Sequence, residues 1–417
     1  MTSSVEAAVA DAHRHEWAFV LAATVRVTGD IDVAEECVQD AYARALASWP
    51  NRGVPARPGA WLTTVARRRA IDLRRRRSTH DRSLPRLVRA AVTDPDEMEI
   101  DADADGRAVA DDRLRLIFTC CHPAIAPEAQ VALTLRLLCG LTTVEVARAF
   151  LVNEAAMAAR ITRAKKKIAA AHVPYRVPSA EELPARLDAV LTVVHLLFTT
   201  GHTAPAGADL VRRDMVERSL DLARMLHALL PDDPDVTGLL ALILLTDARR
   251  PGRVDDSGQM VLLADQDRSD WDRAVIGEGV ALVREALRRR PPGRFALMAA
   301  IAAVHAESPS WNATDWREIV GLYSLLLAIW PSPVVALNRA VAVGFADGPE
   351  AGLDALDALA TEPVLAAYSY LASSRADFLR RLGRVTEARL AYQEALLLTE
   401  NAVEREFLEN CLRRLGH

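Results

Sequence analysis

Leu141–Ala169 reads LTTVEVARAFLVNEAAMAARITRAKKKIA, and its spacing predicts a helix-turn-helix. Thr142 or Thr143 is placed to cap a first helix, the letters LVN form the turn, and a second helix begins near Glu154. The small residue Ala147 stands where the two helices would cross. Two short helices joined in this way commonly read DNA, because the second helix fits the major groove.

The second predicted helix has an apolar inner face and an outer face that is small near its start and cationic further on. Met157, Ile161 and Ile168 form the inner face. The residues left outward are Ala156, Ala159, Arg160, Thr162, Arg163 and Lys167. Small side chains let a helix enter the groove, and Arg and Lys reach phosphates or guanine edges. The alternative is a plain helix end, in which RAKKK is favoured by the helix dipole and simply solvated.

A second basic segment lies upstream, in PGAWLTTVARRRAIDLRRRR, residues 58–77. The whole chain carries a net charge of -5, but the charge is uneven. Between Arg52 and Arg77 nine arginines accompany a single acid, Asp72, whereas residues 94–112 hold nine acids and one base. Burial of so many unpaired charges is prohibitive, so these arginines face solvent or phosphate.

Two residues of the basic segment are not arginines and call for separate interpretation. Trp61 could stack on an unpaired base, but the commoner use of an indole is to anchor its own helix, and we favour that role. Asp72, alone among the arginines, is expected to order one of its neighbours.

The periodic stretches predict an all-α protein. Alanine, leucine and arginine dominate them, aromatic residues make up only 5% of the chain, and alternating β-branched runs are absent. Helices are expected over residues 32–49 and 60–77, and the polar stretch 78–108 has the composition of a flexible linker. The first of these helices would have Asp32 as its N-cap, Pro50 as its stop, and Val33, Cys37, Tyr42 and Leu46 near one face.

The carboxyl-terminal half shows a weak internal repeat. In RADFLRRLGRVTEARLAYQEALLL, the residues Gly383, Ala388, Tyr392 and Ala395 stand at the offsets of a tetratricopeptide helix pair. A poorer copy places Ala351 37 residues before Ala388. An ordinary antiparallel helical bundle remains the alternative.

Several classes of protein and of site are disfavoured. No apolar run reaches the roughly 18 residues of a membrane span, and the first residues lack the pattern of a signal peptide, so a cytoplasmic protein is expected. The five scattered cysteines favour reduced thiols. CCHP, residues 120–123, lacks the paired spacing of a zinc site, and DQDRSDWDR, residues 265–273, lacks the glycine and terminal glutamate of a calcium loop. No catalytic motif is present, so the sequence predicts no enzyme, no metal and no cofactor.

Two long stretches together resemble a known family. These are AEECVQDAYARALASWP with GVPARPGAWLTTVARRRAIDLRRRR, and LRLIFTCCHPAIAPEAQVALTLRLLCGLTTVEVARAFLVNEAAMAARITRAKKKI. They closely resemble bacterial RNA polymerase sigma factors of the extracytoplasmic-function group. LLTDARR, LLADQDRSDWDRA and SPVVALNRAVAV further downstream resemble the subset with a long helical, tetratricopeptide-like extension.

The resemblance implies three binding surfaces. A core-polymerase contact would use Asp32, Glu36, Gln39 and Asp40. A contact to the minus-10 promoter element would use Trp61, Arg67, Arg68, Arg69, Asp72, Arg74 and Arg75. A contact to the minus-35 element would use Ala158, Ala159, Arg160, Thr162, Arg163 and Lys167. The alanines stand where many relatives carry polar readers, which leaves the base preference open.

The expected organisation follows from these surfaces. A region 2-like domain spans residues 1–78, an acidic linker 79–110, a region 4-like helix-turn-helix domain 111–172, a short linker 173–184, and a helical domain 185–417. The last would regulate the factor in cis and could receive an anti-sigma or signalling partner. Two alternatives stay open: an operator-binding regulator with a helical sensor domain, and an enzyme whose site lies in the C-terminal half.

Overall fold

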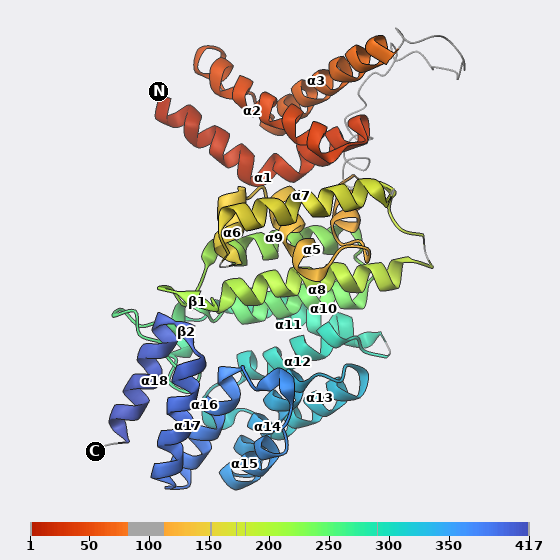
Figure 1. Ribbon diagram of the computed structural model, residues 1–417. Coiled ribbons are helices and arrows are strands. Elements are labelled where there is room, and N and C mark those ends of the chain that lie inside the picture. Colours follow the sequence, from red (N-terminus) through yellow and green to blue (C-terminus); the bar gives the residue numbers. More distant parts are fainter. Residues whose placement is uncertain are drawn as a thin grey trace. The chain divides into compact units, whose positions relative to one another are not determined.

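The computed structural model describes residues 2–81, 112–150, 152–171, 173–179, 181–289 and 291–415. The all-α prediction is confirmed: helices dominate, and the sheet is a minimal parallel pair of β1 (Ala206–Gly207) and β2 (Glu400–Asn401) (Figure 1). From residue 82 onward, the predicted acidic linker 79–110 lies outside the described residues.

The chain divides into two compact units, Met1–Val193 and Val194–His417. The division falls inside α8 (Leu183–His202), downstream of residue 185, where the sequence places the start of the last domain. Among the described residues, α8 is the one helix long and apolar enough to cross a membrane by length and composition.

The first unit opens with three helices that pack on one another, α1 (Thr2–Thr28), α2 (Ile31–Arg52) and α3 (Pro58–Asp81). The prediction of Asp32 as the N-cap of α2 is wrong. Asp30 has extended backbone, and its Oδ1 accepts hydrogen bonds from the amides of Asp32 and Val33 at 2.8 and 3.1 Å. The Asp32 side chain is therefore available for a contact outside its own helix.

Two further expectations for α2 are wrong. The helix continues through Pro50 to Arg52, because the proline ring near the end of a helix disturbs only the preceding turn. The chain leaves the helix at Gly53, which has φ 79°. Leu46 is 48% exposed instead of packed. The buried stripe runs through Ala41, Ala45 and Trp49 at helical spacing, which leaves Leu46 a fraction of a turn away from it.

The rest of the first unit is also helical. Residues 112–120 form a helical segment, followed by α5 (Pro127–Leu137), α6 (Thr143–Ala149) and α7 (Glu154–Ala170). Both α5 and α6 pack against α7. This group contains the predicted helix-turn-helix.

The second unit is a succession of helices in which sequence neighbours pack together, as α10 does with α11 and α16 with α17. Its α-helices after α8 are α9 (Arg213–Leu229), α10 (Pro234–Asp247), α11 (Arg273–Arg288), α12 (Arg294–Glu307), α13 (Trp316–Ile329), α14 (Pro333–Ala346), α15 (Pro349–Asp357), α16 (Ser369–Arg381), α17 (Val385–Leu398) and α18 (Ala402–Arg414). Short 3-10 turns are η1 (Arg250–Arg253), η2 (Arg268–Asp270), η3 (Trp311–Ala313) and η4 (Pro363–Leu365).

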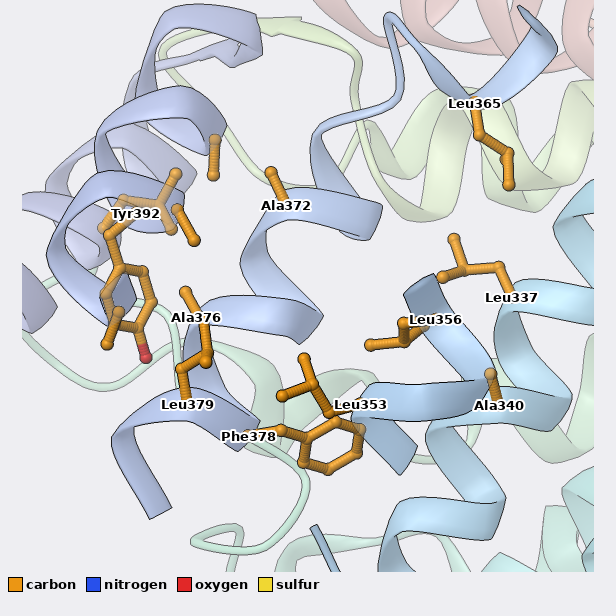
Figure 2. Packing of buried hydrophobic residues seen from close by; sticks show 14 residues of the cluster. Leu337, Ala340, Leu353, Leu356, Leu365, Ala372, Ala376, Phe378, Leu379 and Tyr392 are labelled. Carbon is orange, nitrogen blue, oxygen red and sulfur yellow. The ribbon is translucent and has the colours of Figure 1, made fainter. Parts of the chain in front are cut away.

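The repeat-like segment forms the core shown in Figure 2. Ala388, Tyr392 and Ala395 are buried on α17 against α16, and Gly383 has φ 74° at the turn between the two helices. In the poorer copy the buried small residue is Gly352, one position after Ala351. A Cβ at Gly352 would lie 2.5 Å from the Cα of Gly344, so the glycines permit the close approach of α14 and α15.

Candidate functional site

The helix-turn-helix has the boundaries expected from the sequence. Thr142 Oγ1 accepts a hydrogen bond from the Glu145 amide at 3.2 Å, and the Glu145 carboxylate accepts one from the Thr142 amide at 2.7 Å. This reciprocal pair starts α6. Asn153 caps α7 by accepting from the Ala156 amide at 2.7 Å, so the second helix begins at Glu154.

The inner face of α7 is also as expected. Met157, Ile161, Ala164 and Ile168 are buried, as is Ala147 on α6. The residues assigned to the minus-35 element lie on the other side of α7, where Ala158, Ala159, Thr162, Arg163 and Lys167 are exposed and Arg160 is half-buried. The outer face is therefore open along most of its length.

Three of the predicted cations lie together. Arg160, Arg163 and Lys167 line a hollow of about 300 Å³ beside the start of α5. The Arg160 guanidinium also lies 5.5 Å from the centre of the Phe150 ring, which limits its freedom. This clustering presents several donors to one anionic surface.

The arginines of α3 divide into two groups. Arg68, Arg74 and Arg75 are exposed, as is Asp72, and Arg67 is half-buried. Arg69 is turned toward α2, where its Nε lies 3.0 Å from Asp40 Oδ2. The acid that orders Arg69 thus comes from α2, and the expectation that Asp72 orders a neighbour stays a prediction.

Trp61 lies at the start of the same helix. It is half-buried and packs edge-on against the buried Trp49 of α2, with ring centres 5.5 Å apart. This is the contact of a residue that anchors its helix.

The acidic residues of α2 are only partly open to solvent. Glu36 and Gln39 are exposed, whereas Asp40 is paired with Arg69. Asp32 Oδ1 lies 2.7 Å from Lys165 Nζ of α7. Two of the four residues assigned to the polymerase contact are thus engaged within the first unit.

Glu35 is the important residue of this region that the sequence analysis missed. It is only 5% exposed, and it pairs with Lys165 and, at 2.9 Å, with Arg136 Nη2. The signal was its spacing, since Glu35 stands three residues before the buried Val38 on the inner stripe of α2. The neighbouring Glu36 faces solvent and was assigned instead.

Lys165 lies in the centre of this cluster. Burial alone would lower the pKa of its ammonium group, but the carboxylates of Glu35 and Asp32 outweigh that effect and raise the pKa above its usual value. The lysine therefore stays charged at neutral pH. It joins α7 to α2 as a strongly held cation.

Other contacts join the same two parts of the first unit. Trp17 Nε1 of α1 donates to the Leu137 carbonyl at 3.1 Å, and the Arg136 guanidinium lies 5.8 Å from the Trp17 ring. The hydroxyl of Tyr175 lies 3.0 Å from the carbonyl oxygen of Ala22. The three-helix group and the helix-turn-helix are thus packed together by polar and aromatic contacts.

The cysteines of this unit are core residues. Cys120, Cys121 and Cys139 are buried, and burial raises the pKa of the Cys121 thiol to about 12. Within the residues that the structure describes, no group of three or more His, Cys, Asp or Glu side chains could hold a metal ion.

Known protein families match three parts of the chain, and one relative matches most of its length. The family Sigma-70 region 2 matches residues 14–80, Sigma-70, region 4 matches 115–168, and a family of unknown function, DUF6596, matches 186–287. An uncharacterized protein of Rhizobium meliloti (strain 1021) is 42% identical over 396 residues, which cover 95% of this chain and 93% of that protein. The probable ECF RNA polymerase sigma factor SigI of Mycobacterium tuberculosis (strain CDC 1551 / Oshkosh) is 28% identical over 173 residues, 42% of this chain and 58% of that protein. No solved structure matches.

Proposed function

We propose a promoter-directing role for this chain, which belongs to the sigma-70 family and is of the extracytoplasmic-function type with a C-terminal extension. It would direct core RNA polymerase to a specific set of promoters. Members of this family are transcription factors, and we propose that the chain catalyses no reaction of its own. Its place of action is then the cytoplasm, with the polymerase and the chromosome.

One observation carries the proposal. The two sigma-70 region matches fall on the two helical groups of the first unit. Both groups carry exposed cations, which are Arg68, Arg74 and Arg75 on α3 and Arg163 and Lys167 on α7. Exposed cations on a helix-turn-helix and on a neighbouring helix provide phosphate neutralisation, which supplies much of the affinity for DNA.

The residue assignments are part of the proposal. We assign the minus-35 contact to the outer face of α7, the minus-10 contact to α3, and the polymerase contact to the acidic face of α2 with Asp32, Glu36, Gln39 and Asp40. The alanines at the centre of α7 favour close approach to the groove with few base-specific hydrogen bonds, so sequence preference would depend on Arg160 and Arg163.

The packed first unit has a consequence for this assignment. The minus-10 and minus-35 elements lie about 25 base pairs apart, or roughly 85 Å at about 3.4 Å per base pair. The first unit is too compact to reach both promoter elements while Lys165 of α7 is ion-paired with Asp32 and Glu35 of α2. We propose that this ion-paired form is a resting form and that promoter binding separates α2 from α7.

The extension completes the proposal. We propose that the second unit regulates this transition in cis, because a helical array of its size presents a large surface for a signal or partner. An anti-sigma or other signalling protein would act there.

The test is run-off transcription with purified core polymerase, the full chain and a promoter library. Templates that are transcribed only in the presence of the chain support the sigma role and give its promoter preference. If the chain neither co-purifies with core polymerase nor changes any transcript, the operator-binding alternative replaces it.

A further inference from the structure

The second unit contains a cavity that its packing does not fill. It has a volume of about 440 Å³ and lies between the segment 260–265 and the helices α14, α16, α17 and α18. Aromatic rings form much of its wall, including Trp311, Phe345, Phe378 and Tyr392. Figure 2 shows Phe378 on α16 and Tyr392 on α17 among the core residues that adjoin this cavity. Its size is in the range of cavities that hold small molecules.

A second, more polar hollow of about 270 Å³ shares a wall with this cavity. The two have Met260, Leu262, Leu263, Tyr370 and Glu404 in common. Most of the lining of the large cavity is apolar, and its two arginines, Arg380 and Arg381, are both ion-paired with Asp377. The hollow is also lined by Arg249, Arg253, His202 and Gln266. The two together present an apolar chamber with a cationic end.

Arg249 is the central feature of the cationic end. Its Nε is buried and has no hydrogen-bond partner, and no carboxylate in the described part of the chain forms an ion pair with it. Burial first, and then the positive charges of Arg253 and Arg268, lower the pKa of its guanidinium to about 10. The group therefore stays charged at neutral pH without a counter-ion.

Its cationic neighbours are held by neutral acceptors. Arg253 donates to the carbonyl of His202 and, at 3.0 Å, to the hydroxyl of Thr203. Arg268 is 8% exposed and donates to two carbonyls, those of His305 and Ser308, at 2.7 and 2.6 Å. These bonds fix the two guanidinium groups but bring no negative charge.

The nearby acids act on Arg253 and form no ion pair with Arg249. Burial lowers the pKa of Arg253, and the carboxylates of Glu404 and Asp247 act against that lowering. Asp247 pairs with Arg250 at 3.6 Å, and Glu404 accepts a hydrogen bond from the Tyr370 hydroxyl. Two further buried polar atoms at the hollow, His202 Nδ1 and Gln266 Oε1, also have no partner. Uncompensated buried charge and unsatisfied buried polar atoms are costly, and their convergence on one hollow indicates a ligand that would satisfy them.

We propose that this composite cavity binds a small amphipathic organic acid. Its carboxylate would lie at the cationic end, against Arg249 and Arg253, where a planar guanidinium can hold two oxygens at once. Its apolar body would lie in the larger chamber against Phe345 and Phe378. An apolar chamber next to the cations favours such a molecule over inorganic phosphate, which would leave the chamber empty.

The experiment measures binding of 3-phenylpropionate to the full-length protein by isothermal titration and by thermal shift. The matched neutral probe is 3-phenylpropionamide, and inorganic phosphate is the third probe. We expect saturable binding of the carboxylate, a rise in Tm, and binding of the amide that is weaker by about ten-fold or more. This comparison uses the unmodified chain and needs no polymerase, so it is independent of the proposed sigma role.

Variants locate the site. Arg249→Met removes the unpaired charge and should weaken carboxylate binding by about ten-fold or more. Arg250 is next to Arg249 in the chain but does not line the cavity, so Arg250→Met should change carboxylate binding by less than about two-fold. Equal binding of the carboxylate and the amide, equal binding to R249M and the wild type, or tighter binding of phosphate than of 3-phenylpropionate would each overturn the proposal.

Discussion

The ammonium group of Lys165 lies 2.7 Å from the carboxylate of Asp32, although 133 residues separate them in the chain. The same lysine pairs with Glu35, which is buried on α2 and is also ion-paired with Arg136. A cation from the second helix of the helix-turn-helix is thus held by the first turn of a helix that we assign to polymerase binding. This ion cluster connects stability and function in the first unit.

Replacing Lys165 should destabilise the first unit. Lys165→Met leaves Glu35 with Arg136 as its remaining partner, and loss of one member of a buried ion pair costs about 3 kcal/mol where no partner remains. Because Arg136 remains, we expect a smaller loss of about 1–2 kcal/mol, measured as a lower midpoint of urea unfolding. Lys166→Met, on the exposed neighbour, is the matched control and should stay within about 0.5 kcal/mol. Equal midpoints for K165M and the wild type would contradict the importance of the cluster.

Replacing Arg163 should weaken promoter-dependent transcription without affecting folding. The side chain is exposed on the outer face of α7, so its removal costs only DNA contacts. These are worth about 1–3 kcal/mol, or roughly five-fold to 150-fold in affinity. Run-off transcription and binding to a minus-35 duplex at two salt concentrations measure the effect. Arg284→Ala, an exposed arginine of α11, is the control, and an equal loss in both variants would argue against a specific role of α7.

The two groups of α3 arginines should behave differently. Arg69→Ala breaks the pair with Asp40 and should lower the thermal midpoint by a small but measurable amount, equivalent to about 1 kcal/mol or less. Arg68→Ala and Arg74→Ala, at two exposed arginines, should leave the midpoint unchanged but reduce opening of the minus-10 element, which permanganate footprinting reports. Asp72→Asn belongs in the same series and tests whether Asp72 orders a neighbouring arginine. A drop in the midpoint of R68A as large as that of R69A would show that the division is wrong.

The contact of α14 with α15 should depend on its glycines. A Cβ at Gly352 would meet backbone at 2.5 Å, so Gly352→Ala should destabilise the second unit by about 1–3 kcal/mol despite the higher helix propensity of alanine. Gly321→Ala in α13, where a Cβ meets nothing within 4 Å, should stabilise by up to about 1 kcal/mol. Thermal unfolding of the two variants measures the contrast, and a stabilised G352A would refute the close approach.

The second unit should lose stability in mild acid. Burial, and then the charge of Arg294, lower the pKa of His195 to about 4 from a usual 6.5. Below pH 6.5 the histidine of the unfolded chain takes up a proton that the folded chain does not. The free energy of unfolding therefore falls by about 1.4 kcal/mol per pH unit for one histidine as the pH decreases toward 4, and it levels off below pH 4. The decrease of the urea midpoint between pH 7.5 and pH 4.5 should be smaller in His195→Gln than in the wild type. An identical slope in H195Q and the wild type would exclude His195 as a source of the effect.

The sequence by itself determined the all-α class, the bounds of the helix-turn-helix and its inner and outer faces, because helical periodicity and capping residues act within a few positions. Met157, Ile161 and Ile168 are buried as their spacing predicts, and α7 begins at Glu154. The same local logic failed at the ends of α2, where Asp30 and Gly53 set the bounds in place of Asp32 and Pro50.

Only the tertiary structure decided which charges meet. Helical spacing does not say which acid Lys165 or Arg69 will meet. Asp40 meets its cation through the packing of α2 on α3, and Glu35 meets Lys165 in the ion cluster between α2 and α7. The same holds for Arg249, whose lack of a counter-ion appears only when Arg253 and Arg268 are folded around it. Ion pairs and cavities depend on distances of a few ångströms between segments far apart in the chain, and periodicity carries no information about those distances.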